Sequence, residues 1–559
     1  MHMPYSGRMR GIMSKRLLHT PDGVRDLYGT EFGRKLEIQK QIMSRMQSYG
    51  YQEIQTPTFE YLDVYSKEIG TTPTRDLYKF FDKEGHTLAL RPDFTPSVAR
   101  CVAKYFMEET KPIRLCYVGN TFTNSSLLQG KLKEVTQMGV ELINDTSVEA
   151  DAEMIQLVVE SLKSSGLTNF KIIIGEAEYF EGICEKAGLD RDIISELRSY
   201  VSDKNYMPVC EILEQQPIPA SSKEIIRKMA DITSDFSDFS VARALADNPR
   251  SLEAVDRLEQ LSQVLKDNQM EEYVSFDLSM VSEYTYYTGI IFKAYSRGVG
   301  SPLVSGGRYD KLLHRFGKDA AAIGFAVVID ELMAALSRQD SGKDQYLTFA
   351  LGKGRLAQKT LELLEQIGIT CEEMKDKSSR KLIFVNEELK VRFFLSKGPD
   401  VPTYVEYGAA DIGVVGKDTI EEEQRNVCEV LDLGFGKCRM CVCGPASARE
   451  LLQHHERIRV ASKYPEMAKD YFYNKKHQTI DIIKLNGSVE LGPIVELSDV
   501  IVDIVETGST LKENGLEVLE EICPLSARVI VNPVSMQMQS ARIKELIGKL
   551  RDIVATETK

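Results

Sequence analysis

The stretch at residues 499–516 reads DVIVDIVETGSTLKENGL and carries the most specific chemical signal of the chain. Its first part, residues 500–505, is a β-branched, apolar run with one aspartate, which predicts a buried strand. The run ends at Glu506, and the sequence then favours a helix that begins near Thr510. The pattern therefore predicts a strand, a tight turn and a helix in direct succession.

The turn has the composition of a phosphate-binding loop. Backbone N–H groups and hydroxyls at the start of a helix bind anions, and here they are supplied by Thr507, Gly508, Ser509 and Thr510. Gly508 lets the backbone approach a phosphate because it has no Cβ. Asp503 and Glu506 flank the turn and are suited to ribose hydroxyls or Mg²⁺. A plain helix capped by Thr507 or Ser509 would look the same locally, so the surrounding sequence has to separate the two.

Other blocks of the same half carry glycine turns and cations. Lys353 and Arg355 lie in the turn GKGR, directly after a strand-like run at residues 346–351. Further blocks follow in order at residues 399–406, 408–418, 433–436, 462–465 and 487–493. Together with the phosphate-binding turn, across nearly all of residues 345–559, they resemble the short-form catalytic subunit of ATP phosphoribosyltransferase.

That resemblance implies two lobes of the periplasmic-binding-protein type with the substrates between them. The reaction joins N1 of the adenine of ATP to C1 of phosphoribosyl pyrophosphate and releases pyrophosphate, which is the first step of L-histidine biosynthesis. A neutral ring nitrogen attacks, so positioning and charge stabilisation matter more than a strong base. We expect the turn to hold the 5-phosphate, and Mg²⁺ to act on the pyrophosphate together with Lys353, Arg355 and Lys463. The resemblance places Glu490 near the ribose or the metal. No metal ligand is firmly assigned.

A polar stretch at residues 337–345 separates two apolar patterns and predicts a linker. It divides the chain into a leader at 1–13, an N-terminal domain at 14–336 and a catalytic domain at 346–559. Within the N-terminal domain, residues 166–270 are charged and helical in character, which predicts an inserted helical lobe. The overall fold class is therefore multidomain, α+β followed by α/β.

The N-terminal domain begins with an amphipathic helix that carries Ile38, Ile42 and Met46 at helical spacing and ends near Gly50, before a strand at residues 51–55. Four segments recur in order along the domain, namely PDGVRDL from Pro21, LRPDFT from Leu90, YYTG from Tyr286 and SGGRYDKL from Ser305. Together they resemble histidyl-tRNA synthetase. The resemblance implies a class II synthetase core, an antiparallel sheet flanked by helices, that dimerises through the first long helix and the strand after it.

The domain departs from that family where the family supplies charge. Phe122 is followed by Thr123 and not by an arginine, and the loop at 124–129 lacks the usual acid and arginine. Residues 282–285 read SEYT where the family has Arg-Gly-Leu-Asp, and the third motif ends in Asp330 and Glu331 instead of Glu-Arg. Guanidinium groups stabilise the charge of ATP and of the acyl-adenylate. Without them, and without an anticodon-reading domain after the third motif, we expect no aminoacylation.

The residues that the resemblance places around the amino acid remain. Asp93 and Thr95 match the acceptors of the α-ammonium group, and the rest of the predicted histidine site consists of Gln137, Glu141, Tyr286 and Tyr287. A carboxyl group and aromatic walls suit a protonatable imidazole. Each of these residues alone would be ordinary core or surface, so the prediction depends on the set. It makes L-histidine a feedback inhibitor that binds the N-terminal half.

Composition excludes several other classes. The net charge is −13, which opposes a broad electrostatic grip on tRNA or DNA. No apolar run approaches the roughly 20 residues of a membrane-spanning helix, and no secretory signal is visible. The 10 cysteines show no paired spacing, which favours free thiols in the cytoplasm. The trio Cys438, Cys441 and Cys443 fits buried strand cysteines better than a metal site.

We therefore predict a cytoplasmic ATP phosphoribosyltransferase, inhibited by histidine through its N-terminal half. We expect a dimer-based homo-oligomer such as a tetramer. Two alternatives stay open at this point. One is a non-catalytic small-molecule binder, since the C-terminal fold type also serves solute capture, and the other is an active histidyl-tRNA synthetase with an appended domain.

Overall fold

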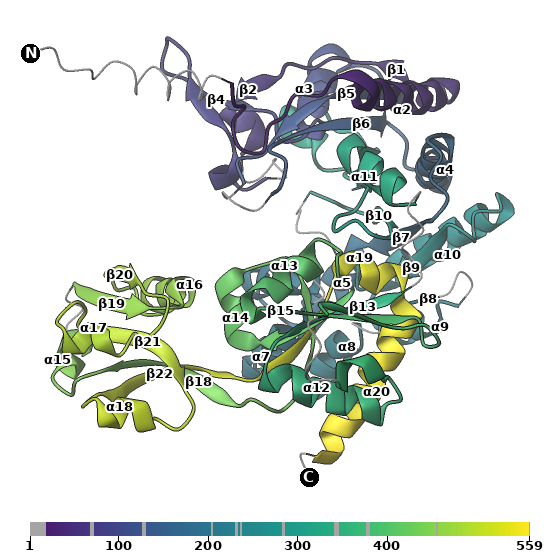
Figure 1. Cartoon of the computed structure of the whole chain (residues 1–559). Coiled ribbons are helices and arrows are strands. Elements are labelled where there is room, and N and C mark those ends of the chain that lie inside the picture. Colours follow the sequence, from purple (N-terminus) through teal and green to yellow (C-terminus); the bar gives the residue numbers. More distant parts are fainter. Residues whose placement is uncertain are drawn as a thin grey trace, which may run out of the picture. The chain divides into compact units, whose positions relative to one another are not determined.

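The computed structural model describes residues 18–66, 72–125, 130–202, 205–229, 233–234, 238–281, 286–339, 346–375, 381–453 and 457–557. The chain forms two compact units (Figure 1). Unit 1 comprises Met1–Ser202 and Val209–Gly342, and unit 2 comprises Asp203–Pro208 and Lys343–Lys559. The predicted leader at 1–13 lies outside the described residues. No described helix is long and apolar enough to cross a membrane.

Unit 1 is built on a nine-stranded sheet of order β1-β5-β6-β12-β11-β10-β7-β9-β8. Its strands are β1 (Gln52–Glu53), β5 (Ile113–Phe122), β6 (Glu134–Ile143), β7 (Phe170–Glu176), β8 (Thr233–Ser234), β9 (Val274–Asp277), β10 (Ile290–Ser296), β11 (Val304–Arg308) and β12 (Ala322–Val328). The pairs β1·β5 and β7·β9 are parallel and the others antiparallel. The sheet is thus mixed, where the sequence led us to expect an antiparallel one. A smaller sheet joins β2 (Phe59–Tyr61), β4 (Thr87–Leu90) and β3 (Lys79–Phe81).

Helices α2 (Gly29–Ser48), α3 (Thr95–Tyr105), α4 (Val148–Ser164) and α11 (Ile329–Gln339) complete the core of this unit. Helix α2 buries Ile38, Ile42 and Met46, which confirms the predicted amphipathic helix. Helix α11 continues to Gln339, so the first residues of the predicted linker are helical, because Arg338 and Gln339 are good helix formers. Residues 340–345 of that linker lie outside the described residues.

The predicted helical insertion at 166–270 needs a correction at its start. Strand β7 occupies Phe170–Glu176 and pairs with both β10 and β9 in the main sheet. Its short aliphatic run is buried and is too brief for a helix of the core. The helical part then consists of α5 (Ala177–Ala187), α6 (Arg191–Ser202), α7 (Tyr206–Gln215), α8 (Ala220–Met229), α9 (Ser240–Leu245) and α10 (Pro249–Asp267).

Unit 2 has two lobes, each with its own sheet and core. The first lobe has a six-stranded sheet of order β14-β15-β13-β16-β23-β17. Its strands are β13 (Leu347–Gly352), β14 (Ile383–Asn386), β15 (Val391–Ser396), β16 (Ile412–Gly416), β17 (Cys428–Asp432) and β23 (Ala527–Val531). Its helices are α12 (Arg355–Gln366), α13 (Val401–Glu406), α14 (Lys417–Glu423), α19 (Pro533–Met538) and α20 (Ser540–Glu557).

The second lobe has a five-stranded sheet of order β20-β19-β21-β18-β22. Its strands are β18 (Cys438–Gly444), β19 (Ile458–Ser462), β20 (Ile480–Lys484), β21 (Val500–Val505) and β22 (Glu517–Leu525). Its helices are α15 (Ala448–Gln453), α16 (Pro465–Lys469), α17 (Leu491–Ile494) and α18 (Ser509–Glu513). The predicted strand at 500–505 is confirmed residue for residue.

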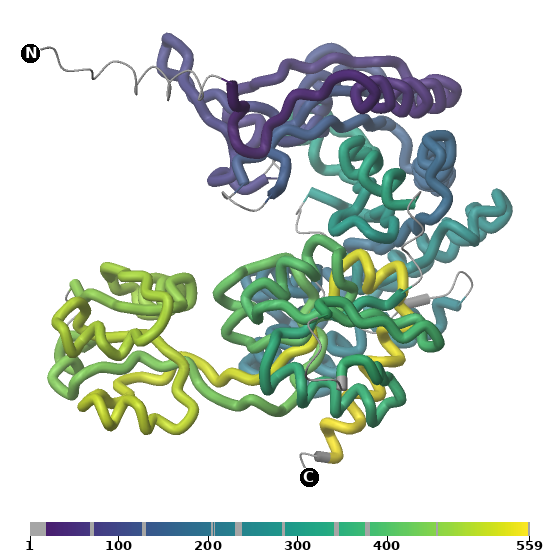
Figure 2. The backbone as a smooth tube through the Cα atoms, viewed as in Figure 1, coloured from purple at the N-terminus to yellow at the C-terminus, as the bar shows by residue number. Residues whose placement is uncertain are grey.

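The chain crosses between the two lobes twice, at residues 433–437 and at Ser526. The two crossings are hydrogen-bonded to each other, since Leu433 N donates to Ala527 O at 2.9 Å and Ala527 N to Phe435 O at 3.0 Å. In Figure 2 they are the green and the yellow segments of the backbone that connect the two lobes. They form a hinge of two adjacent backbone segments.

Strand β18 contains all three cysteines of the trio, of which Cys441 and Cys443 are buried as predicted and Cys438 is partly exposed. Cys441 and Cys443 are buried in one apolar cluster of the second lobe, and Met440 and Val442 are buried in the cluster on the opposite face. All 10 cysteines are free. Among the described residues, the one group with metal-like proximity lies elsewhere, in the turn that holds Asp82, Glu84 and His86.

Candidate functional sites

Unit 1 contains a pocket of about 250 Å³ where its strands converge. Residues around α3, β5, β6, β10, β11 and β12 line it, namely Thr72, Pro92, Asp93, Thr95, Thr123, Gln137, Tyr286, Tyr287, Ser305, Gly306, Tyr309, Gly324, Phe325, Ala326 and Val328. All of the predicted histidine-site residues are among them except Glu141. Segments nearly 200 residues apart in the sequence are thus brought together as the resemblance implied.

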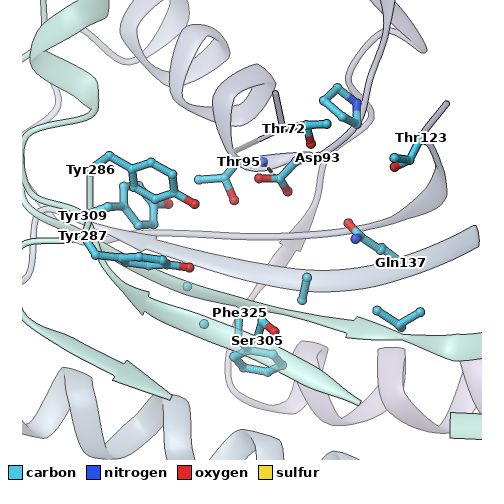
Figure 3. A pocket seen from close by; sticks show the side chains of 15 residues that line it. Thr72, Asp93, Thr95, Thr123, Gln137, Tyr286, Tyr287, Ser305, Tyr309 and Phe325 are labelled. Atoms are coloured by element: carbon cyan, nitrogen blue, oxygen red, sulfur yellow. Dashed lines mark hydrogen bonds between the residues drawn. The ribbon is translucent and has the colours of Figure 1, made fainter. Parts of the chain in front are cut away.

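The pocket has two chemically different ends (Figure 3). Three tyrosines form one end: the rings of Tyr286 and Tyr287 lie 4.7 Å apart, and Tyr309 meets Tyr286 edge-on at 6.1 Å. Thr123 and Gln137 lie toward the other end, with Asp93 between the two. The Gln137 Oε1 atom is buried and has no hydrogen-bond partner among the described residues. An unsatisfied buried acceptor in a cavity indicates room for a ligand donor.

Glu141 lies one layer beneath the pocket and does not line it. Its side chain is only 1% exposed, and it accepts a hydrogen bond from Thr95 Oγ1 at 2.8 Å and another from the Tyr309 hydroxyl. Burial raises the pKa of this carboxyl to about 8. It fits there because Gly324 faces it across the sheet, where any Cβ would lie 1.8 Å from Glu141 Oε2. The carboxyl therefore supports Thr95 and Tyr309, which do reach the cavity.

Tyr309 is the residue of this pocket that the sequence analysis missed. It stands inside the SGGRYDKL segment that carried the resemblance, directly after β11. The available signal in the sequence was an aromatic residue inside a segment that already carried the resemblance. Ser305 and Phe325 were also missed, and strand alternation alone would not have marked them.

Residues at the positions where the family carries its catalytic charges have other contacts in this structure. Thr123 lines the pocket. Asp330 lies 2.9 Å from the buried ammonium of Lys35 on α2 and accepts a hydrogen bond from Thr136 N at 2.8 Å. It is therefore committed to holding α2 against the sheet. Residues 126–129 of the second-motif loop, and residues 282–285, lie outside the described residues.

In unit 2, β21 leads directly into α18, and the predicted phosphate-binding turn lies between them. Gly508 has φ = 76°, in the left-handed region, which explains the glycine. Thr507 Oγ1 lies 3.0 Å from Ser509 Oγ and accepts from Ser509 N at 3.4 Å. Thr507, Ser509 and Thr510 are exposed. We call residues 507–510 the cradle.

Cations approach the cradle from both lobes. Arg355 begins α12 of the first lobe, and its guanidinium lies 4.0 Å from Glu506 of the second. The Arg355 side chain is 92% exposed, so this contact holds it weakly. Lys353 lies in the same turn after β13. Lys463 follows β19, which runs parallel to β21, so the two strands end at the same edge of the sheet.

The remaining predicted residues gather at that edge. Burial raises the pKa of the Asp503 carboxyl, the nearby Glu490 carboxylate raises it further, and the Lys463 ammonium opposes this. The edge thus combines backbone amides, hydroxyls, one ammonium and two neighbouring acids. Such an arrangement can hold a phosphate and bring cations to a second anionic group beside it.

Comparisons with known proteins divide at the same place as the fold. Residues 23–332 match the histidyl-tRNA synthetase family, and residues 397–552 match the ATP phosphoribosyltransferase family. The C-terminal part is 76% identical over 210 residues to the ATP phosphoribosyltransferase of Lachnoclostridium phytofermentans, covering 38% of this chain and 98% of that protein.

The N-terminal part is 40% identical over 326 residues to the ATP phosphoribosyltransferase regulatory subunit of Ruminiclostridium cellulolyticum, covering 58% of this chain and 78% of that protein. Among solved structures, the chain is similar to an ATP phosphoribosyltransferase regulatory subunit/histidyl-tRNA synthetase from Bacillus halodurans. The sequences are 29% identical, the TM-score is 0.55, and the match covers 68% of this chain and 99% of that one.

Proposed function

This chain belongs to the ATP phosphoribosyltransferase family, with a histidyl-tRNA synthetase-like regulatory part ahead of the catalytic part, and on that premise we propose which residues bind the substrates and the regulator. The enzyme catalyses the first step of histidine biosynthesis. Of the two alternatives from the sequence, a mere solute binder is opposed by the enzyme relatives, and an active synthetase is opposed by the regulatory-subunit relatives.

The cradle residues, together with Asp503 and Glu506, bind the 5-phosphate and ribose of phosphoribosyl pyrophosphate. N1 of adenine attacks C1 as the bond from C1 to the pyrophosphate oxygen breaks, and the leaving pyrophosphate takes that electron pair. Lys353, Arg355 and Lys463 counter the charge that builds up on it. The single observation that supports this assignment is that Lys463 and Glu490 act on Asp503 at the sheet edge that bears the cradle, while Arg355 of the first lobe lies 4.0 Å from Glu506.

Mg²⁺ fits the same edge. Asp503 and Glu490 are close enough for each carboxyl to feel the charge of the other, a repulsion that a divalent cation relieves. Both offer the oxygen ligands that Mg²⁺ prefers. When bound, the ion would neutralise part of the pyrophosphate charge.

The test follows formation of phosphoribosyl-ATP by absorbance from ATP, phosphoribosyl pyrophosphate and Mg²⁺. Thr510→Val removes a cradle hydroxyl at nearly constant volume, and Thr556→Val, near the end of α20, is the matched control. We expect a higher KM for phosphoribosyl pyrophosphate only in Thr510→Val. An unchanged KM would remove the cradle from the site.

The pocket of unit 1 binds L-histidine. Asp93 takes the α-ammonium group, and the tyrosine end, backed by Glu141, surrounds the imidazole ring. The cavity volume, the aromatic walls and the unsatisfied Gln137 oxygen support this assignment. Histidine inhibition that persists unchanged in a Tyr287→Ala, Glu141→Ala protein would place the sensor elsewhere.

The assembly is a homo-oligomer whose dimers form through α2 and β1, as the resemblance to the synthetase family implies. Light scattering coupled to size-exclusion chromatography tests it. A strictly monomeric active enzyme would contradict it.

A further inference from the structure

We propose that Asp418 and Glu422 of helix α14 are positioning residues for the reaction: from the first lobe they hold residues 463–467 of the second lobe and thereby fix Lys463 beside the cradle. The inference rests on the role proposed above for Lys463. It adds two residues that contact neither the cradle nor the glycine turn.

Glu422 caps a helix of the opposite lobe. Its Oε2 atom accepts hydrogen bonds from the backbone N–H groups of Glu466 at 3.0 Å and Met467 at 3.3 Å. These donors belong to the first turn of α16, where N–H groups have no partner within the helix. Helices usually receive such a cap from a residue just before them. Here the cap comes from about 45 residues upstream and from another lobe.

Asp418 stands one helical turn before Glu422, so both carboxyls project from the same face of α14. It interacts with the hydroxyl of Tyr464, a residue only 8% exposed. The Lys463 ammonium acts on the same carboxyl and lies 5.5 Å from the centre of the Tyr464 ring. A path of direct contacts thus runs from Asp418 through Tyr464 to Lys463.

Gly416 provides the space for this arrangement. A Cβ at that position would lie 2.1 Å from Asp418 Oδ1, so a side chain there would push the carboxyl out of place. The φ of Gly416 is −71°, an ordinary value, which leaves space as the reason for the glycine.

The two crossings between the lobes explain why these contacts matter for the position of Lys463. We call the contacts of Asp418 and Glu422 with residues 463–467 the latch. Two adjacent backbone segments join the lobes, and a joint of that kind leaves the angle between them free to vary. Lys463 and the cradle belong to the second lobe, whereas Lys353 and Arg355 belong to the first. The contacts of α14 with residues 463–467 tie Lys463 to the first lobe, so its ammonium stays where the pyrophosphate can meet cations from both lobes together.

The experiment compares Glu422→Met, Glu422→Gln and Asp418→Asn in the full-length enzyme. Methionine keeps the length of the Glu422 side chain but removes the acceptor, whereas glutamine retains one acceptor oxygen. Asparagine at position 418 also retains an acceptor, but it removes the negative charge that acts on the Lys463 ammonium. Glu423→Met, the next residue on another side of the same helix, is the matched control. We expect kcat/KM for phosphoribosyl pyrophosphate to fall about 10- to 50-fold in Glu422→Met and Asp418→Asn, and less than about 3-fold in Glu422→Gln and in the control.

Two further readouts separate positioning from general damage. Hydrogen exchange of the peptide spanning residues 463–470 should be at least about 10-fold faster in Glu422→Met, with the rest of the second lobe unchanged. In a Lys463→Ala background, the Glu422→Met substitution should cost almost nothing more, because the latch acts through that lysine.

The outcomes distinguish this inference from the proposed function. If Lys463→Ala has full activity, the proposed role of Lys463 fails. If Lys463→Ala is impaired but Glu422→Met exchanges faster and still turns over normally, or if the two effects multiply, the latch is overturned.

Discussion

The pocket of unit 1 and the cradle of unit 2, for which we propose histidine and phosphoribosyl pyrophosphate as ligands, are built in opposite ways. Side chains from distant strands build the pocket, and a buried carboxyl supports it from below. The cradle is four consecutive residues, mostly exposed, whose shape depends on one glycine in the left-handed region. The pocket should therefore be sensitive to side-chain chemistry at many positions, and the cradle to backbone conformation at one.

The largest expected effect is that of Gly508→Val, which tests whether the cradle depends on the backbone conformation of this one glycine. A β-branched residue is strained at φ = 76°, and its side chain would occupy the path of the phosphate. We expect kcat/KM for phosphoribosyl pyrophosphate to fall by about 100-fold or more, the scale seen when an anion-stabilising donor is lost. Histidine binding, measured by calorimetry, should not change. Near-normal turnover would mean that the cradle tolerates strain and is not built around its backbone.

Tyr309→Phe tests the side-chain dependence of the pocket. It removes a hydroxyl that donates to Glu141 and leaves the ring in place. The substitution leaves the buried Glu141 carboxyl without one of its two hydrogen-bond donors, which should weaken histidine inhibition by about 10- to 30-fold. Activity without histidine should stay the same. The inhibition constant gives the answer, and an unchanged constant would show that the layer beneath the pocket does not matter.

The buried carboxyl also makes a prediction about pH. Because the pKa of Glu141 is raised to about 8 in the folded protein from an ordinary 4.5, the folded state binds the proton more tightly than the unfolded state. Stability contributed by this group is present below pH 4.5 and is lost as the pH rises to about 8, at no more than about 1.4 kcal/mol per pH unit.

Glu141→Gln, which is neutral throughout, should remove that part of the decline. Thermal unfolding of unit 1 between pH 5.5 and 8.5 measures it, with Glu149→Gln on α4 as a control. Parallel pH profiles for the wild type and Glu141→Gln would contradict the assignment.

The smallest expected effect concerns the packing under the cradle. Cys441 is buried in a cluster with Val505 and Leu511, the residues that end β21 and anchor α18. Cys441→Ala should cost about 1 kcal/mol of stability and raise the KM for phosphoribosyl pyrophosphate only 2- to 3-fold, since a small cavity opens beneath an intact backbone. A chelator should have no effect on the unfolding transition. A larger rise in KM would show that the cradle, like the pocket, depends on the layer below it.

The two sites also differ in how far the sequence alone could describe them. Residues 500–510 are local in sequence, so the apolar run and the glycine gave the strand without error and the start of the helix within one residue. The position of Glu141 depended on Gly324 and Tyr309, which face it from other strands. The spacing of four residues in the sequence predicts the same role for Gln137 and Glu141. The residues that face each of them across the sheet decide which one reaches the cavity.

Strand β7 illustrates a second limit. Its seven residues stand next to a long helical stretch, and composition averaged over the region hid them. The carboxyls of α14 illustrate a third, because a helix cap normally lies beside its helix and no local pattern points to a residue in another lobe.

The hinge has a consequence for the engineering of the enzyme. Cys438 and Leu525 are paired neighbours on β18 and β22, so the second lobe enters and leaves the fold at one point. The second lobe is one continuous segment, inserted into the first lobe between β17 and β23. These two strands of the first lobe pair with each other. A short hairpin turn in place of the second lobe would close the six-stranded sheet without changing its order. The corresponding segment of a relative should therefore be exchangeable at the same two residues, Cys438 and Leu525, without a change in the first lobe.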